Sequence, residues 1–471
     1  MVFSSLVFLG LYLPVILLLY FLSLRLSDNF KIANKVVLAG SLFFYSWGEP
    51  LWIVAMLFTS TVDYINGRRI GAAKEQYNGL GRLKGIVISS IIINLGILFF
   101  FKYLGFALEN IGNIFSVDIQ FTSPDLPIGI SFYTFQSLSY IIDVYRGRTG
   151  VQKNYFDYIL YVSMFPQLVA GPIVRYSDIE QQIRGRTVTM SDFGTGVQRF
   201  CIGLGKKVVL ANSAGSAAVM LLDGSLTELP ALGAWLGITF FTFQIYFDFS
   251  GYSDMAIGIG RMFGFKYNEN FRHPYISTSI TEFWRRWHIS LGAFFRDFLY
   301  IPLGGNRSHQ VRNILVVWFL TGLWHGASWN FIAWGMYYGV LLLIEKHTAS
   351  YLAKIPVAIR WAVTMLIVLF GWGLFYFVDP TRLYHFIRAF FFMNPTPIID
   401  LKTSSVFFQF FWMIPIFIIG SSPMPGKLFN KLLAERPKLD FIRSILVAAL
   451  LAVCFMLLVG ESYNPFLYFR F

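Results

Sequence analysis

The sequence has little charge and very little cysteine. Charged residues make up only 13% of its 471 residues, whereas 56% are hydrophobic and 19% are aromatic. Since a soluble domain carries roughly 25% charged residues, this composition excludes an ordinary soluble protein and predicts an all-α polytopic membrane protein. The two cysteines, Cys201 and Cys454, match no metal or disulfide spacing, and we interpret them as small buried hydrophobic residues.

Long polar segments are also missing. Nothing in the chain is polar enough to fold as a separate soluble part, so we predict a single membrane-embedded domain over residues 1–471. The N-terminus lacks the basic region and the cleavage site of a signal peptide, so its first apolar run is expected to be a retained membrane helix. The net charge of +13 is spread through short loops, which favours membrane lipids as partners and argues against nucleic acid.

About ten to twelve membrane helices or re-entrant pieces are predicted from the apolar segments. Clear spans are expected at residues 3–24, 85–105, 127–144, 232–249, 361–378, 405–420 and 444–460. The apolar stretch 36–65 is interrupted by the letters WGEP at 47–50, which predicts a turn between two short membrane helices. Residues 155–174 contain Phe-Pro and Gly-Pro steps. We therefore expect a re-entrant or tilted piece there, buried in protein or lining a cavity.

The charges of the loops predict the orientation of the chain. Basic residues precede and follow the 36–65 hairpin, so both loops are expected in the cytoplasm and the N-terminus outside. Residues 106–125 contain acidic residues but no Lys or Arg, as expected of an outside loop. The aromatic C-terminus, residues 464–471, is expected at a membrane interface.

One histidine lies deep in an apolar run, in the segment TGLWHGASWN at residues 321–330. Arg312, the nearest charge before it, is 13 residues away from His325. This is about 20 Å of helix, so His325 is predicted near mid-depth of a ~30 Å hydrocarbon layer. An ionisable group at that depth is a functional candidate, and a packed structural histidine is the alternative.

A second histidine lies in residues 277–302. Ser279 and Glu282 fit a capping box, and an aromatic face then recurs at helical spacing, with His288 on it. We predict one amphipathic helix at the cytoplasmic interface. Arg285 and Arg286 could anchor lipid headgroups or bind a phosphate-bearing donor or an acidic carrier protein. Alone, His288 would more often be a packing residue.

These residues suit acyl transfer better than other chemistry. We find no recognisable nucleophile motif and no three converging metal ligands in the sequence. A buried neutral histidine can take a proton from a hydroxyl that attacks a thioester or an ester. Two other classes stay open. One is a transporter or flippase that uses His325 and Asp248 in a proton or solute path, although the sequence shows no internal repeat. The other is a scaffold that only anchors a secreted partner.

The histidine motifs resemble those of the membrane-bound O-acyltransferase family. The two motifs are WHG at 324–326 and FWRRWH at 283–288. Further similar segments are LPIGISFYTFQ at 126–136, FPQLVAGP at 165–172, YFDFSGYSD at 246–254, YIPLGGNR at 300–307 and the aromatic end at 465–471. The resemblance is closest to the branch that modifies bacterial polysaccharides, which includes the membrane subunit of alginate O-acetyltransferase. The membrane proteins of peptidoglycan O-acetylation and of D-alanyl transfer are related.

This resemblance implies a helical bundle with a central funnel or tunnel, in the cytoplasmic membrane of a bacterium. It implies that His325 is the catalytic residue and His288 the second signature residue. The candidate substrate-binding residues are Trp324, Trp287, Arg285, Arg286, Asn330 and Asp248. Helix length independently predicts a break or bend near Gly326, because a single straight helix from Arg312 to Glu345 would be about 50 Å long, too long for one span.

The implied reaction passes an acyl group from a cytoplasmic thioester to an extracytoplasmic acceptor. The donor would be acetyl-CoA or another acyl thioester, with no tightly bound cofactor and no metal. An SGNH-type acetyltransferase outside the membrane is the expected partner, and a carrier protein is another. The resemblance favours acetyl transfer for O-acetylation of an exopolysaccharide or cell-wall polymer. D-alanyl transfer to teichoic acid is the alternative.

Overall fold

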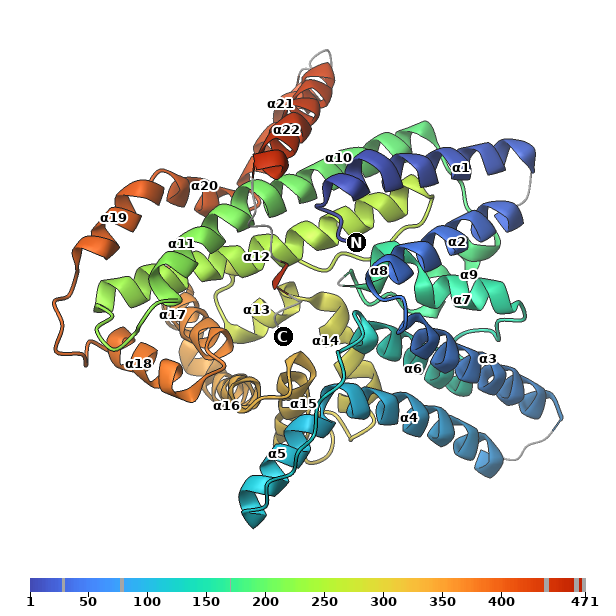
Figure 1. The fold of residues 1–471 in the computed structure, drawn as a ribbon, viewed down its shortest axis with the longest axis horizontal. Helices are drawn as coiled ribbons and strands as arrows, with labels where there is room; N and C mark the ends of the chain where they lie inside the picture. The colour runs from blue at the N-terminus through green and yellow to red at the C-terminus, as the bar shows by residue number, and fades with distance from the viewer. Residues whose placement is uncertain (28–29, 77–79, 170, 436–439, 461–465, 468–471) are drawn as a thin grey trace. The chain divides into compact units, whose positions relative to one another are not determined.

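The computed structural model describes residues 1–27, 30–76, 80–169, 171–435, 440–460 and 466–467. Over these ranges the chain forms helices and loops and no β-strand, which confirms the all-α class (Figure 1). The described residues divide into two compact units. The first unit is 1–200 with 253–269, and the second is 201–252 with 270–471. The single domain over 1–471 stays a prediction.

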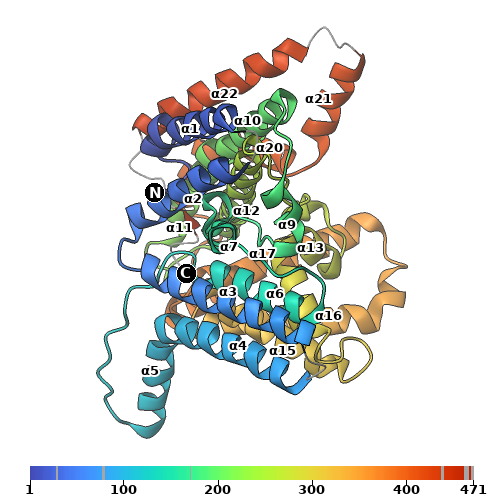
Figure 2. The ribbon, with the colours of Figure 1, turned by 90° about the vertical axis from the view of Figure 1, so that its right-hand side faces the viewer.

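The first unit is built around a buried helix. Its helices are α1 (Leu13–Leu26), α2 (Phe30–Gly48), α3 (Ile53–Gln76), α4 (Leu80–Lys102), α5 (Leu104–Phe115), α6 (Ile130–Arg146), α7 (Tyr155–Ser163), α8 (Phe165–Leu168) and α9 (Tyr176–Arg184), with a π-helical turn, η1 (Phe8–Tyr12), before α1. Nearly every side chain of α6 is buried, and α6 packs against α3 and α4 (Figure 2).

Two predictions for the first unit are confirmed. The chain breaks between α2 and α3 at the predicted WGEP turn. The 155–174 segment is interrupted at Met164 and buried, as expected of irregular backbone enclosed by protein. Residues 106–125 begin with helix, because α5 extends to Phe115. The expected position of this segment on the outer side stays a prediction.

The second unit contains most of the predicted site. Two long helices, α10 (Met190–Gly205) and α12 (Ala231–Met262), supply residues to both units. The other helices of the second unit are α11 (Asn212–Leu222), α13 (Ile280–Arg286), α14 (Ile289–Phe295), α15 (Gln310–His325), α16 (Trp329–Leu352), α17 (Val357–Tyr376), α18 (Pro380–Phe390), α19 (Leu401–Phe410), α20 (Met413–Gly420), α21 (Met424–Glu435) and α22 (Asp440–Gly460). Three short turns accompany them, η2 (Lys206–Ala211), η3 (Pro274–Ile276) and η4 (Arg296–Tyr300).

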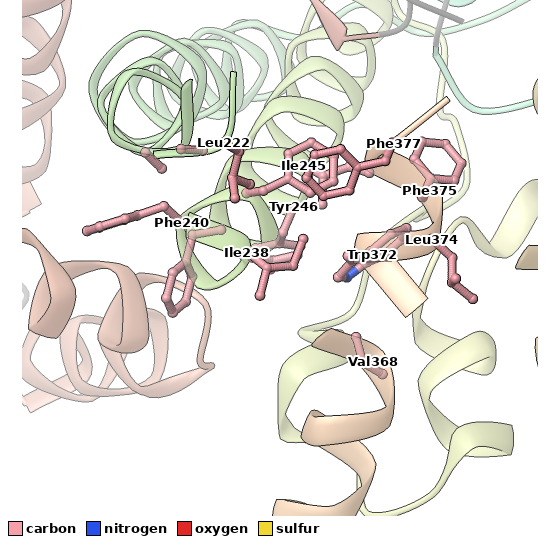
Figure 3. Packing of buried hydrophobic residues seen from close by; sticks show 14 of the residues in the cluster. Leu222, Ile238, Phe240, Ile245, Tyr246, Val368, Trp372, Leu374, Phe375 and Phe377 are labelled. Atoms are coloured by element: carbon pink, nitrogen blue, oxygen red, sulfur yellow. The ribbon is translucent and has the colours of Figure 1, made fainter. Parts of the chain in front are cut away.

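The core of the second unit is largely aromatic. Side chains of α12 such as Phe240 and Tyr246 are buried in the same cluster as Trp372 and Phe375 of α17 (Figure 3). Aromatic side chains remove a large apolar area from solvent and pack edge to face. This cluster also holds Trp287, so the core supports the chain segment of the second histidine.

Several helices are suited to a membrane by length and composition. They are Phe8–Leu26, Leu83–Lys102, Val357–Tyr376 and Phe441–Gly460, and α19 with α20 forms a fifth candidate that is bent by 61°. The total of ten to twelve membrane helices or re-entrant pieces stays a prediction.

Candidate active site

The two candidate histidines line one cavity of the second unit. The cavity has a volume of about 510 Å³, within the usual range for small-molecule sites. Its polar and ionisable lining residues are Thr281, Arg285, His288, Arg296, Tyr300, Thr321 and His325. The rest of the lining is mostly aromatic and aliphatic, with Trp284, Trp287 and Trp318 the largest side chains.

His325 is the last residue of α15. Gly326 is extended, at φ −168° and ψ 154°, and α16 begins three residues later, which confirms the break predicted near Gly326. The packing of α15 on α16 depends on small residues. A Cβ atom at Gly322 would meet the carbonyl oxygen of Phe331, so the two backbones approach as closely as glycine allows. This close hairpin fixes the end of α15, and with it His325.

Aromatic rings surround the half-buried His325. The centroid of its imidazole lies 4.9 Å from that of Trp324, 5.0 Å from that of Trp334 and 5.1 Å from that of Phe375. All three contacts are edge to face, a favourable geometry for aromatic rings. Trp324 also lies 6.0 Å from the ring of His288, so its indole neighbours both histidines.

The prediction of one continuous amphipathic helix over 277–302 is wrong. Helix α13 ends at Arg286, and α14 begins at Ile289. Between them His288 adopts the left-handed region, at φ 44° and ψ 55°. The same aromatic face still lines the cavity, because Trp284 and Trp287 of that face border it together with His288.

The break has a cause in the preceding loop. The carbonyl oxygen of Asn270 accepts a hydrogen bond from the amide of Ile289 at 2.9 Å, and its side-chain oxygen accepts one from the amide of Ser290 at 3.1 Å. At the other end, the amide of Arg272 donates to the carbonyl oxygen of Arg286 at 2.9 Å. These bonds satisfy backbone groups that would otherwise continue the helix.

The start of α13 is capped as predicted, with one difference. The hydroxyl of Ser279 accepts a hydrogen bond from the amide of Glu282 at 3.0 Å. The Glu282 carboxylate accepts from the amide of Thr278 at 2.9 Å, one residue before the position that a capping box requires.

Burial determines the charge of His288. Its ring contacts the aromatic rings of Phe271 and Trp324, and the residue is only 6% exposed. Desolvation lowers the pKa of His288 to about 4, so the ring is neutral at neutral pH. A neutral imidazole can donate one hydrogen bond and accept another, which suits a residue that orients a substrate.

The structure separates the two predicted arginines. Arg285 lines the cavity. Arg286 instead forms an ion pair with Glu282, four residues earlier, at 2.7 Å, and donates to the carbonyl oxygen of Arg272 at 3.1 Å. Arg296 joins Arg285 at the cavity and also pairs with Asp297 at 2.7 Å. A guanidinium group at this position can bind a phosphate.

Sequence reasoning missed Arg296 and Tyr300 as lining residues. A signal for Arg296 was present, because it follows Arg285 by eleven residues, about three helical turns. The break at His288 changes the helix path, but both arginines still lie at the cavity.

Three other candidates, Trp324, Asn330 and Asp248, lie outside the cavity lining. Asn330 is buried at the start of α16, and its amide donates weak hydrogen bonds to the carbonyl oxygens of Leu374, at 3.3 Å, and Phe375, at 3.4 Å. Asp248 is buried and forms an ion pair with Lys207 at 2.8 Å. Their roles in substrate binding stay predictions, whereas the observed contacts stabilise the helix ends and the core.

Asp248 also holds part of the C-terminal tail. Its second carboxylate oxygen accepts a hydrogen bond from the amide of Leu467 at 2.8 Å. Phe466 stacks on Tyr252 with centroids 4.7 Å apart. Phe466 and Leu467 are both buried in protein, and the expected interface position of the tail stays a prediction. The other residues of 464–471 lie outside the described part of the chain.

The chain is thus a helical membrane protein with two histidines in one cavity. Its similarity to known proteins identifies the family with these features. Residues 148–386 match the family model of the membrane-bound O-acyltransferases, about half of the chain. The chain belongs to the membrane-bound O-acyltransferase family and is an O-acyltransferase.

Three relatives describe its position within the family. "Probable alginate O-acetylase AlgI" of Pseudomonas aeruginosa is 44% identical over 384 residues, which cover 80% of this chain and 72% of the relative. The protein of the same name from Pseudomonas putida is 38% identical, and the match covers the whole of both chains. The peptidoglycan O-acetyltransferase of Helicobacter pylori is 31% identical, with 100% of this chain and 98% of the relative covered.

Proposed function

We propose that this enzyme passes an acetyl group from a cytoplasmic thioester, with acetyl-CoA as donor, across the bacterial cytoplasmic membrane. The acetyl group serves the O-acetylation of an exopolysaccharide or a cell-wall polymer. The observation that carries the proposal is that His288 and His325 line the same cavity, together with Arg285. The names of the relatives, which are O-acetylases and an O-acetyltransferase, support acetyl over D-alanyl as the transferred group.

His325 acts as the general base. Its imidazole takes the proton of the acceptor hydroxyl while the hydroxyl oxygen attacks the carbonyl carbon of the thioester. The new C–O bond forms, the C–S bond breaks, and the imidazolium returns the proton to the leaving thiolate. The acceptor oxygen must approach within about 3 Å of the ring nitrogen. A transient acyl-histidine is the variant of this scheme in which the imidazole itself attacks the thioester.

The other groups of the cavity position the reactants. His288, which burial keeps neutral, orients the acceptor hydroxyl or the thioester by a hydrogen bond. Arg285 binds a phosphate group of the donor, and the indole of Trp287 confines the acyl end, while Trp324 contacts the rings of both histidines. The acceptor hydroxyl belongs to an extracytoplasmic SGNH-type partner or to the polymer itself, and the N-terminus of the chain lies on that same outer side.

The test uses the full-length protein reconstituted in liposomes, with labelled acetyl-CoA on one side and soluble alginate as hydroxyl acceptor. We expect His325→Ala to lower acetyl transfer by at least about 100-fold, the usual contribution of a general base. His347→Ala is the matched control, because His347 is exposed on α16 and bonds only within its own helical turn. Transfer by His325→Ala at the wild-type rate would refute the assignment.

The donor is tested with the same proteoliposomes. We supply acetyl-CoA and a D-alanyl thioester of a carrier protein in parallel and measure thiol release and labelled product. Consumption of acetyl-CoA alone supports the proposal. Consumption of the D-alanyl thioester alone contradicts it and favours the teichoic acid pathway.

A further inference from the structure

The second unit contains another cavity, a groove between α16 and α17 that reaches the start of α13. Its volume is about 190 Å³. We infer that this groove binds one anionic phospholipid, with an acyl chain along the groove and the headgroup phosphate on the guanidinium of Arg360.

The walls of the groove are suited to an acyl chain. They are formed mostly by aliphatic side chains, which include Ile280, Leu341, Ile344, Leu352, Ile355, Ile359, Val363 and Ile367. About half of the surface of Ile344, Ile359 and Val363 is exposed. Because α17 is one of the helices long and apolar enough to cross a membrane, hydrocarbon is the expected surrounding of these side chains.

The charges of the groove select an anion. Glu345 already has partners for both carboxylate oxygens, because Oε2 accepts a hydrogen bond from the amide of Ile280 at 2.5 Å and Oε1 accepts one from the amide of Thr281 at 3.0 Å. Arg360 is half-buried, and its Nε atom is buried without a hydrogen-bond partner among the described residues. A guanidinium in apolar surroundings requires an anion or another acceptor, and a phosphate offers oxygens that match its fork of donors.

The position of Arg360 favours a headgroup over a solute anion. Arg360 is the fourth residue of α17, so it lies about one helical turn from the end of a candidate membrane span. The phosphate of a phospholipid lies at that depth, and its acyl chain continues along the apolar part of the helix. An inorganic phosphate would leave the aliphatic walls uncovered.

The groove and the catalytic cavity are joined by a short helix. The first amides of α13 bond to Glu345 at the groove, and seven residues form the whole helix. Trp284 and Arg285 of this helix line the cavity of the histidines. A lipid in the groove therefore covers the start of the helix whose other end positions cavity residues.

The experiment measures lipid retention by the full-length protein. Protein in mild detergent is mixed with equal amounts of phosphatidylglycerol and phosphatidylcholine, and bound lipid is counted by native mass spectrometry. We expect the wild type to retain one phosphatidylglycerol in preference to phosphatidylcholine. Arg360→Gln should lose about tenfold of this preference, because it removes the positive charge that favours a headgroup of net negative charge over a zwitterionic one.

Two further variants keep the inference falsifiable. Lys354→Gln removes a nearby exposed positive charge that does not line the groove and should keep the wild-type preference. Val363→Trp should weaken retention of the whole lipid by filling the groove while leaving the charge of Arg360 in place. Equal retention by wild type and Arg360→Gln would overturn the inference, as would an equal loss in Lys354→Gln. A rise in melting temperature with inorganic phosphate as large as that with phosphatidylglycerol would also overturn it.

Discussion

Replacing His288 with asparagine should make the stability of the protein less sensitive to acid. Asparagine is a suitable replacement because His288 has φ 44° and ψ 55°, a region that asparagine enters more readily than most side chains. Another side chain could add roughly 1–2 kcal/mol of backbone strain at this position. His288→Asn therefore removes the titrating ring while it keeps the backbone path between α13 and α14.

The size of the effect follows from the two pKa values. An imidazole in the unfolded chain titrates near 6.5, whereas burial lowers the pKa of His288 in the folded protein to about 4. The unfolded state therefore binds the proton first. Stability is fully present above pH 6.5 and is lost as the pH falls from about 6.5 to about 4. Proton linkage gives a loss of roughly 2 kcal/mol at pH 5 and roughly 3 kcal/mol at pH 4, both relative to pH 8.

Thermal unfolding can detect this loss. With an unfolding entropy of about 2 cal/mol/K per residue, 2 kcal/mol corresponds to roughly 2 °C for a chain of this length. Tryptophan fluorescence reports unfolding in detergent from pH 8 to pH 5 for the wild type, His288→Asn and the control His347→Asn. Acid-sensitive groups elsewhere act equally in all three proteins, so the difference between the slopes isolates His288. Equal slopes in the wild type and His288→Asn would show that the buried ring does not titrate as argued.

Three other changes test the core, the cavity and the hairpin. Asp248→Asn should cost about 3 kcal/mol because it leaves the buried Lys207 without its ion-pair partner. Adding Lys207→Met should recover much of the loss in thermal unfolding, and no recovery would refute the pair as its source. Gly292→Trp should reduce acyl transfer at least tenfold, because Gly292 lines the cavity and a large side chain there would fill it. Gly292→Ala should leave the rate unchanged, because a Cβ at this position meets nothing within 4 Å. Similar rates for the two variants would contradict this. Gly335→Ala should cost roughly 1–3 kcal/mol, since its Cβ would meet the carbonyl oxygen of Trp318; an unchanged melting temperature would count against the close packing of α15 on α16.

The sequence predicted those features that depend on neighbouring residues. The all-α class follows from the apolar composition, and the interruption at 47–50 follows from glycine and proline within the turn itself. The end of α15 at His325 was predictable because Gly326 follows it and an unbroken helix would exceed one span. In each case the signal and the structure lie within a few residues.

The break at His288 could not be predicted in this way. No glycine or proline marks it, and the apolar spacing continues across it. The hydrogen bonds that end one helix and begin the next come from Asn270 and Arg272, more than ten residues earlier in the chain. The spacing of the apolar side chains continues across the break and therefore indicated a single helix. It carries no information on which backbone groups a distant loop will bond.

Asp248 shows the same limit for the candidate site. A carboxylate at the end of an apolar span was interpreted as a substrate or proton site. The structure instead brings Lys207 and the amide of Leu467 to its two oxygens. Leu467 is more than 200 residues away in sequence, so no local pattern could indicate the contact. These contacts give Asp248 a structural role, and its role in substrate binding stays a prediction.

The two histidines lie at helix ends with different surroundings. His325 is the C-terminal residue of a 16-residue helix and is only half-buried. His288 precedes the first turn of α14 and is enclosed by aromatic rings, and desolvation there disfavours a positive charge. A general base must carry a proton while the acyl group moves, and an environment that stabilises this charge lowers the barrier. We therefore propose that His325, which is less buried than His288, carries the proton, and that His288 stays a neutral hydrogen-bonding group. A transient acyl-histidine would place the carried group at the same ring, so the division of roles between the two histidines holds for either form of the mechanism.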